Sequence, residues 1–205
     1  MKKIIIVLAL LVAVLGVSQA AFAIPAFLTV TADNLFVDIV VNGVSLDPLG
    51  INADNWKLAD TYAIDLNYGV ENIIDFNVSN AGGLVTATNP AALLAQLTIE
   101  DVWFKEGGST IVSGPESYWS IISSAFGYTP VTPDAYGDNS SSNIWYDVNG
   151  GPIAGISGAA QWIWSDADPK SAILSLKVTP VPEPMTMLLF GPALLGLVGL
   201  KRKKV

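Results

Sequence analysis

The chain has 205 residues, with 10 basic and 18 acidic side chains, and it contains neither histidine nor cysteine. These absences exclude a Ser-His-Asp triad, a Cys-His pair, a conventional zinc site and a disulfide framework. Residues 24–180 hold four lysines and 17 carboxylates, a net charge of −13, and no arginine precedes Arg202. This composition excludes nucleic acid as a partner, because a phosphate backbone requires clustered basic residues. The charge by itself favours solubility.

The first 23 residues have the three parts of a secretory signal peptide. Lys2 and Lys3 precede an apolar run over residues 4–17, and small residues follow. Ala21-Phe22-Ala23 matches the A-x-A pattern of a cleavage site. We expect signal peptidase to cut after Ala23, with a cut after Ala20 as the alternative, and residues 24–180 to form the exported domain.

The exported domain has a hydrophobic period of two more often than a helical period, which predicts strands. Asn-Gly and Gly-Gly turn sequences separate runs of β-branched and aromatic residues. The predicted strands are residues 29–31, 36–41, 61–66, 73–78, 93–99, 144–148 and 172–178. Short helices are expected only near residues 91–94 and 117–124. Many short strands at this spacing indicate an all-β fold, a sandwich or a barrel.

Residues 113–158 are rich in Gly, Pro, Ser and Asn and predict a long irregular excursion, a kind of segment that often carries function. Four of its aromatic residues are candidate platforms for a sugar ring, because their neighbours favour exposed loops: Trp119, Tyr128, Tyr136 and Trp145. Simple packing is the alternative for these four. Trp103, Trp162 and Trp164 lie in strand-like sequence, where a core or edge position is expected.

Three sets of residues could supply the hard oxygen ligands of a structural Ca²⁺ ion, namely Asp33, Asn34 and Asp38; Asp134, Asp138 and Asn139; and Asp166 with Asp168. Each set also fits an ordinary turn or a solvated surface. A carboxylate pair could instead serve as the acid and nucleophile of a glycosidase, but no motif supports catalysis. We therefore expect no enzymatic activity and no cofactor other than this candidate calcium ion.

The C-terminal segment, residues 181–205, combines a rigid polar box, an apolar span and a basic stop. Pro182-Glu183-Pro184 precedes the apolar residues 185–200, and four basic residues follow at 201–204. As a helix the span would reach roughly 24 Å, short of a hydrocarbon core of roughly 30 Å. Snorkelling lysines and local thinning can close this gap. We expect a transmembrane helix over residues 185–200 with its basic end in the cytoplasm; a buried core helix is the alternative.

The order of box, span and basic stop resembles the PEP-CTERM sorting signal of exopolysaccharide-producing Gram-negative bacteria. The resemblance implies that an exosortase processes the chain near the box. The protein would then be held in the inner membrane before processing and would afterwards reach the cell surface or the extracellular matrix.

The exported domain resembles galactose-binding-like jelly-roll modules over most of residues 28–178. The motifs that carry this resemblance are Ala32-Asp33-Asn34-Leu35-Phe36, Val41-Asn42-Gly43-Val44, Trp56 with Thr61-Tyr62, Val70-Glu71-Asn72-Ile73-Ile74, Asn80-Ala81-Gly82-Gly83, the run over residues 89–97, and Gln161-Trp162-Ile163-Trp164. A Phe-Arg pair common in those modules is missing after Trp164. The resemblance implies a jelly-roll-like β-sandwich that binds or organises extracellular polysaccharide without catalysis. A purely structural surface protein with protein partners is the alternative.

Overall fold

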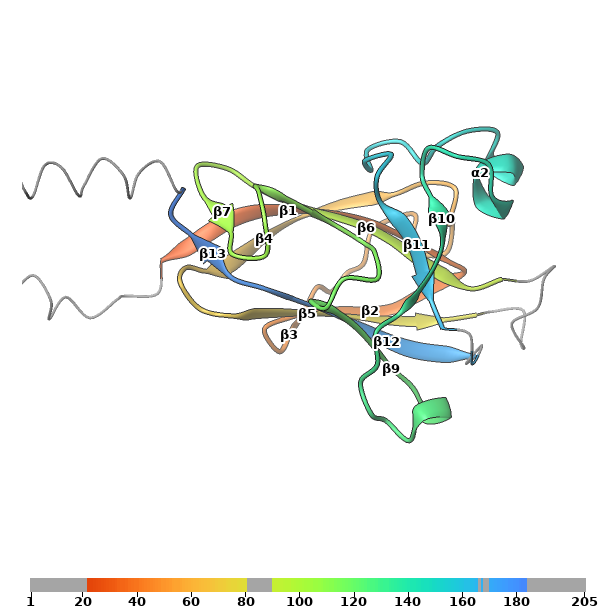
Figure 1. Cartoon of the computed structure of the whole chain (residues 1–205), viewed down its shortest axis with the longest axis horizontal. Coiled ribbons are helices and arrows are strands. Elements are labelled where there is room, and N and C mark those ends of the chain that lie inside the picture. The colour runs from red at the N-terminus through yellow and green to blue at the C-terminus, as the bar shows by residue number, and fades with distance from the viewer. Residues whose placement is uncertain (1–21, 81–89, 166, 168–169, 184–205) are drawn as a thin grey trace, which may run out of the picture.

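The computed structural model describes residues 22–80, 90–165, 167 and 170–183. Over these residues the chain forms two antiparallel sheets that face each other, with a short third sheet at one end (Figure 1). The all-β prediction is confirmed. Within the described residues no helix is both long and apolar enough to cross a membrane. The transmembrane helix expected over residues 185–200 lies outside them.

The first sheet, sheet A, has the strand order β10-β11-β6-β1-β4, and β8 also pairs with β6. Its strands are β1 (Ala23–Asp33), β4 (Asp60–Asn67), β6 (Ala92–Ile99), β8 (Thr110–Val112), β10 (Asp134–Asp138) and β11 (Gln161–Trp164). The second, sheet B, has the order β3-β2-β5-β12-β9. Its strands are β2 (Leu35–Val41), β3 (Val44–Ser45), β5 (Asn72–Ser79), β9 (Trp119–Ile122) and β12 (Ser171–Val178). The third sheet pairs β7 (Trp103–Phe104) with β13 (Pro180–Val181), and the helical pieces are η1 (Ser124–Phe126) and α2 (Ile144–Asn149).

The main core lies between the two sheets and follows from the period of two. In β5 the buried residues Ile74, Phe76 and Val78 alternate with outward-facing ones. Phe76 stacks on Trp119 of β9, with ring centroids 5.8 Å apart. Burying one face of each sheet in this way supplies the main favourable free energy of folding.

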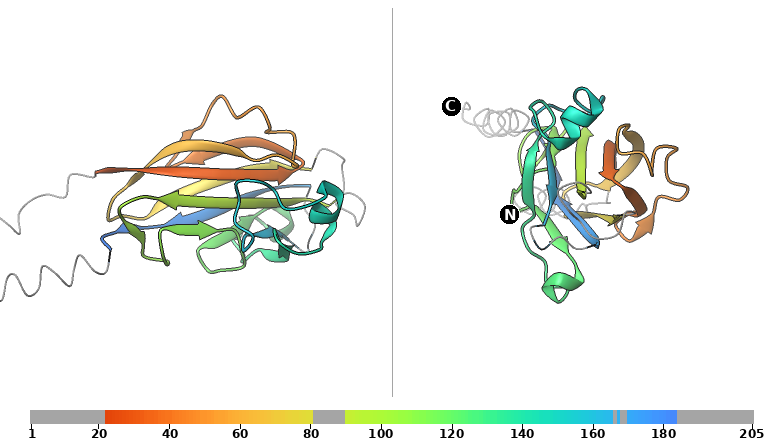
Figure 2. Two further views of the ribbon diagram at one scale, coloured as in Figure 1. Left: turned by 90° about the horizontal axis from the view of Figure 1, so that it is seen from above. Right: turned by 90° about the vertical axis from the view of Figure 1, so that its right-hand side faces the viewer.

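A second buried layer covers the outer face of sheet A. From Leu28 to Asp33 every residue of β1 is buried, so this half of the strand is covered on both sides. The covering segment follows β10 and includes α2 (Figure 2). Trp145 of α2 stacks on Trp162 of β11, with centroids 4.8 Å apart and planes at 15°. The second half of the excursion thus folds back on sheet A instead of extending into solvent.

The buried amide of Asn139 holds this covering segment together. Its Nδ2 donates to the carbonyls of Ile153 and Ile156 at 3.0 and 2.9 Å, and its Oδ1 accepts from the Ile153 N–H at 2.7 Å. Backbone groups of an irregular segment must find partners when they are buried. A single asparagine therefore satisfies three of them.

Three of the predicted elements were wrong. The strand expected over residues 144–148 is the helix α2, because the Asn143 side chain accepts from the Tyr146 N–H as an N-cap and Gly150 ends the helix at a φ of 76°. The helix expected near residues 91–94 is the start of β6, whose apolar run reflects burial on both faces. The helix expected over residues 117–124 is β9 followed by the short η1.

The described chain enters and leaves the domain at the same end, opposite α2 (Figures 1 and 2). The turn between β4 and β5 binds both ends. The Tyr68 N–H donates to the Phe22 carbonyl, and the Gly69 N–H donates to the Pro180 carbonyl, both at 2.9 Å. The first and last described strands are thereby fixed to one turn.

Ser113 joins two short strands that share one edge of β6. Its backbone N–H donates to the Ala95 carbonyl, and its carbonyl accepts from the Gln161 N–H. Its fully buried hydroxyl accepts from the Ala95 N–H at 3.0 Å and donates to the Gln161 carbonyl at 2.7 Å. The side chain thus replaces ladder bonds between β8 and β11.

We predict that Ser113→Ala lowers the free energy of unfolding by about 1 to 3 kcal/mol, because it leaves the buried Ala95 N–H and Gln161 carbonyl without the hydroxyl. Urea unfolding of the full-length protein measures the change. The exposed Ser117 is the matched control, and Ser117→Ala should change the free energy by less than about 0.5 kcal/mol. Equal effects at both serines would contradict the role of the Ser113 hydroxyl in joining β8 and β11.

Candidate functional site

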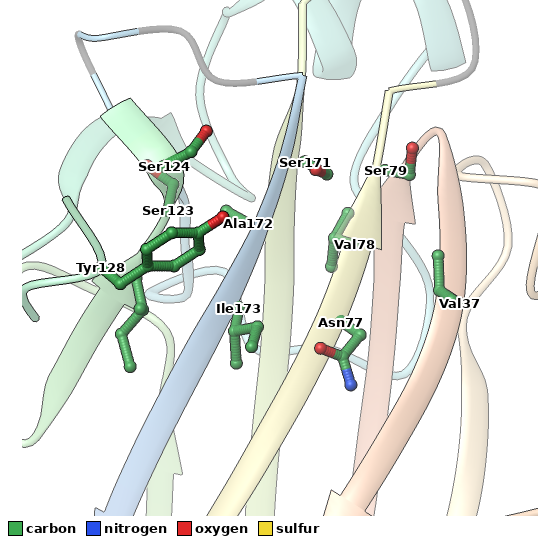
Figure 3. Close-up of a pocket in the computed structure, with 11 residues that line it drawn as sticks. Val37, Asn77, Val78, Ser79, Ser123, Ser124, Tyr128, Ser171, Ala172 and Ile173 are labelled. Carbon is green, nitrogen blue, oxygen red and sulfur yellow. The ribbon is translucent and has the colours of Figure 1, made fainter. Parts of the chain in front are cut away.

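A hollow of about 390 Å³ lies on the outer face of sheet B and is the best candidate site (Figure 3). We call it the Tyr128 hollow. Four strands of the sheet contribute to it, together with the loop that follows β9. Its lining residues are Val37, Asn77, Val78, Ser79, Ile122, Ser123, Ser124, Tyr128, Ser171, Ala172 and Ile173.

The strand register assembles the floor of this hollow. Asn77 of β5 lies opposite Ile173 of β12, and Ile173 lies opposite Ile122 of β9. These residues alternate with the core residues of the same strands, so their side chains face outward. An amide therefore stands in one row with two aliphatic side chains across three strands.

A closed loop carries Tyr128 above this floor. Ile121 and Val131 exchange two backbone hydrogen bonds, at 2.8 and 3.0 Å, which close the loop at its base. Tyr128 adopts a left-handed φ of 62°, and its N–H donates to the Ser123 carbonyl at 2.9 Å. The ring is 72% exposed and lies beside β12 near Ala172 (Figure 3). The phenol is thus held over the sheet by backbone bonds and is not packed into the core.

Ser123 lines the hollow, but its hydroxyl is buried behind the surface. The residue is only 3% exposed, and its Oγ has no hydrogen-bond partner in the part of the chain that the structure describes. A buried hydroxyl in this state costs free energy. Because this oxygen has almost no accessible surface, it is not presented to a ligand in the hollow.

The lining is neutral, although the domain is strongly acidic. None of the described residues that line the hollow carries a charge at neutral pH. Two carboxylates of the same sheet each accept from a serine, since Ser45 Oγ donates to Asp38 at 2.6 Å and Ser175 Oγ donates to Asp75. The site offers one aromatic face, aliphatic floor groups, hydroxyls and an amide.

Of the four aromatic residues predicted as platforms, only Tyr128 lies in this hollow. The expected exposure was wrong for Trp119 and Trp145, which are 1% and 3% exposed. Trp119 is on the inner face of sheet B, and Trp145 is buried because the excursion packs back over sheet A. Tyr136 is half-buried and meets Trp145 edge to face at 6.4 Å.

The three tryptophans expected at core or edge positions differ in exposure. Trp162 and Trp164 are buried, as expected from their strand sequence. Trp103 is 40% exposed on the short edge strand β7.

The structure separates the carboxylates in two of the three sets proposed as calcium ligands. Asp33 lies in sheet A and Asp38 in sheet B, while Asp134 and Asp138 mark the two ends of β10. Asp138 accepts from the Ser140 N–H and Oγ, both at 2.9 Å. Among the residues described here, no group of three acidic side chains could hold a metal ion. Asp166 and Asp168 lie outside the described residues. A calcium site remains a prediction from the sequence alone.

The residues predicted for signal-peptide cleavage and for sorting lie at the end of the domain where the described chain enters and leaves. Ala23 is the first residue of β1 and pairs with Asn67 of β4. Pro182 and Glu183 follow β13 and are partly exposed. Pro184 lies outside the described residues.

No protein-family model, curated protein or solved structure matches the chain. Its function is therefore inferred from its own side chains.

Most of the Tyr128 hollow could not be found from the sequence. The alternation in residues 72–79 and 171–178 marks Asn77 and Ile173 as facing away from the core. It does not say that β5 and β12 are neighbours, or that the loop after β9 reaches the same face. Those facts depend on pairing between residues about 100 positions apart, such as Asp75 with Ser175.

A second polar group with an unusual environment is Asp33, which is 4% exposed at the end of β1. Trp145 Nε1 donates to its Oδ2 at 2.9 Å, and the Asn34 amide donates to its Oδ1. Burial raises the pKa of this carboxyl, and the two hydrogen bonds only partly oppose the shift. The protonated form is therefore favoured more in the folded chain than in the unfolded chain.

We predict that Asp33→Asn stabilises the protein progressively, relative to wild type, as the pH rises from about 4 to about 7. Because the folded pKa of Asp33 is raised, its favourable contribution is complete below the unfolded value of about 3.9 and is lost as the pH rises through the folded pKa. Urea unfolding at several pH values measures the difference. The control is Asp138→Asn, which removes a carboxyl whose pKa is lowered chiefly by the Ser140 N–H. Because its folded pKa lies below the unfolded value of about 3.9, the effect of Asp138→Asn should change only below about pH 4 and stay flat from about 4 to about 7. Parallel curves for the two variants would contradict the raised pKa of Asp33.

Proposed function

We propose that this protein is an exported, exosortase-sorted surface or matrix protein that binds neutral extracellular polysaccharide in the Tyr128 hollow and performs no catalysis. The observation that carries the proposal is the exposed Tyr128 ring, held over a neutral hollow by a loop closed at Ile121 and Val131. An exposed aromatic ring beside convergent polar groups is the arrangement that stacks on a flat ligand and orients its hydroxyls.

The polar groups of the hollow match the chemistry of a sugar. The amide of Asn77 can both donate and accept, and the hydroxyls of Ser79 and Ser171 can do the same. Pyranose hydroxyls have the same dual capacity. The apolar groups of Val37 and Ile173 can contact the C–H face of the ring.

The charge of the domain favours a neutral glycan over an acidic one. Residues 24–180 carry a net charge of −13, and the described lining of the hollow has no basic group to offset it. A polymer rich in uronates or phosphates would be repelled at long range. The ligand class is therefore an uncharged segment of polysaccharide.

The chain connectivity supports the finer assignment to a jelly-roll sandwich. Successive long strands alternate between the sheets, with β1, β4, β6 and β11 in sheet A and β2, β5, β9 and β12 in sheet B. Such crossing connections are typical of jelly rolls. The described chain ends after β13, at the end of the domain opposite α2. In our proposal this end faces the membrane. The Tyr128 hollow lies near the start of β12, at the other end, and so faces away from the membrane.

The decisive experiment is Tyr128→Ala in the full-length protein, measured as retention on the host's own exopolysaccharide. We expect binding to weaken by about 1 to 3 kcal/mol, the range for losing one aromatic stacking platform. Thermal stability should hardly change, because the ring is 72% exposed. Retention on a neutral glucan or galactan should exceed retention on polygalacturonate.

Trp103→Ala is the matched control, because Trp103 is an exposed aromatic residue on β7, at the other end of the domain. It should leave binding unchanged. The glycan proposal would fail if Tyr128→Ala bound the polysaccharide as well as the wild type does. It would also fail if the wild type did not bind, or if Trp103→Ala weakened binding as much as Tyr128→Ala.

A purely structural surface protein is the second candidate, and the burial of Trp119 and Trp145 favours it. Those two residues serve packing, so the glycan proposal depends on Tyr128 alone among the predicted aromatics. Failure of the retention experiment would select this candidate.

The sorting part of the proposal has a separate test. Replacing Pro182, Glu183 and Pro184 with alanine should leave the domain folded, because the replaced residues follow the last described strand, β13. In a cell with an intact exosortase we expect the variant to remain unprocessed in the inner membrane. Cell fractionation and immunoblotting measure this, and equal release of variant and wild type would contradict it.

A further inference from the structure

A second hollow, of about 180 Å³, opens at the end of β1 on the outer face of sheet A. We call it the Asp33 hollow. It is lined by Asp33, Trp56 and Trp145, and by Ile144 and Val148 of α2. Its volume is below the usual range for sites that enclose a drug-sized ligand. The space suits one small chemical group.

The polar wall of this hollow is a buried carboxylate with spare acceptor capacity. From the residues that the structure describes, Asp33 accepts one hydrogen bond at each oxygen, from Trp145 Nε1 and from the Asn34 amide. An ionised carboxylate offers about four acceptor positions, and neither donor is positively charged. A buried negative charge without an opposite charge is costly, and a cation in the hollow would reduce that cost.

The aromatic walls of the hollow are rigid and suited to a cation. Trp145 is fixed by its stacking on Trp162, and Trp56 meets Trp162 edge to face at 6.3 Å. The ammonium of Lys57 already lies 5.4 Å from the centroid of the Trp56 ring. Tryptophan is the strongest aromatic partner for cations, and the attraction increases when the cation is desolvated.

We propose that the Asp33 hollow binds a small organic monocation, an alkylammonium group, between the Asp33 carboxylate and the indoles of Trp56 and Trp145. The carboxylate supplies the opposite charge, and the indole faces replace the water around the alkyl groups. Exposed Ile144 and Val148, at 39% and 58%, form an apolar rim. The Asp33 hollow lies on sheet A and the Tyr128 hollow on sheet B, so the cation proposal does not depend on the glycan proposal.

The test titrates the full-length protein with tetramethylammonium, followed by the NMR shift of the Trp145 indole N–H. The uncharged probe is tert-butanol, which has a similar shape. We expect saturable binding of tetramethylammonium with a Kd of about 1 to 10 mM, in keeping with a few kcal/mol from one cation in an aromatic site. The neutral probe should bind at least about tenfold more weakly.

Two variants and one control identify the site. Asp33→Asn keeps an acceptor for Trp145 Nε1 but removes the charge, and it should weaken binding at least about tenfold, as should Trp56→Leu. Asp138→Asn removes a partly exposed carboxylate that does not line the hollow, and it should have no effect. Circular dichroism checks the fold of each variant, and Trp56→Leu alone decides if Asp33→Asn fails to fold. The proposal is overturned if the wild type shows no saturable shift, if tert-butanol binds equally, or if a folded variant of either kind binds as the wild type does.

Discussion

The structure depends on covering sheet A from both sides. One face of β1 meets sheet B across the main core, and the other face meets the excursion, so the stretch from Leu28 to Asp33 has no exposed side. The stack of Trp145 on Trp162 closes this second layer. Burying large aromatic surfaces in this way contributes several kcal/mol, and the chain has no disulfide to replace it. The excursion is thus a structural part of the fold.

This arrangement divides the two outer faces between different tasks. The outer face of sheet A is covered along the Leu28–Asp33 half of β1, except at the small opening beside Asp33, whereas Phe27 stays exposed on the uncovered half. The outer face of sheet B keeps polar and aliphatic side chains at the surface, and a short loop adds Tyr128 to it. A ligand that needs a broad, shallow contact can therefore approach sheet B, whereas only a small group fits the opening on sheet A. The division follows from which sheet the excursion covers.

The sequence predicted the strands with a clear period of two, and it missed what depends on distant contacts. Residues 36–41, 73–78 and 172–178 lie in strands as expected, because alternation is a local property. Trp145 was misjudged because its Gly- and Asn-rich surroundings indicate a loop but not the surface on which the loop packs. Residues 91–94 were misjudged because burial on both faces removes the alternation. Tyr128 was proposed correctly as an exposed residue, yet its partners Asn77 and Ile173 depended on sheet order.

The turn that binds both ends of the described chain has a topological consequence. Tyr68 and Gly69 are consecutive, and their N–H groups bond to Phe22 and Pro180, so the two ends of the fold are separated by little more than one turn of chain. Nearby ends of this kind permit circular permutation. A short linker could join residue 180 to residue 22, and new termini could open in an exposed connection such as the one around Gly107 and Gly108. The order of the strands in space would then be preserved although their order along the chain had changed.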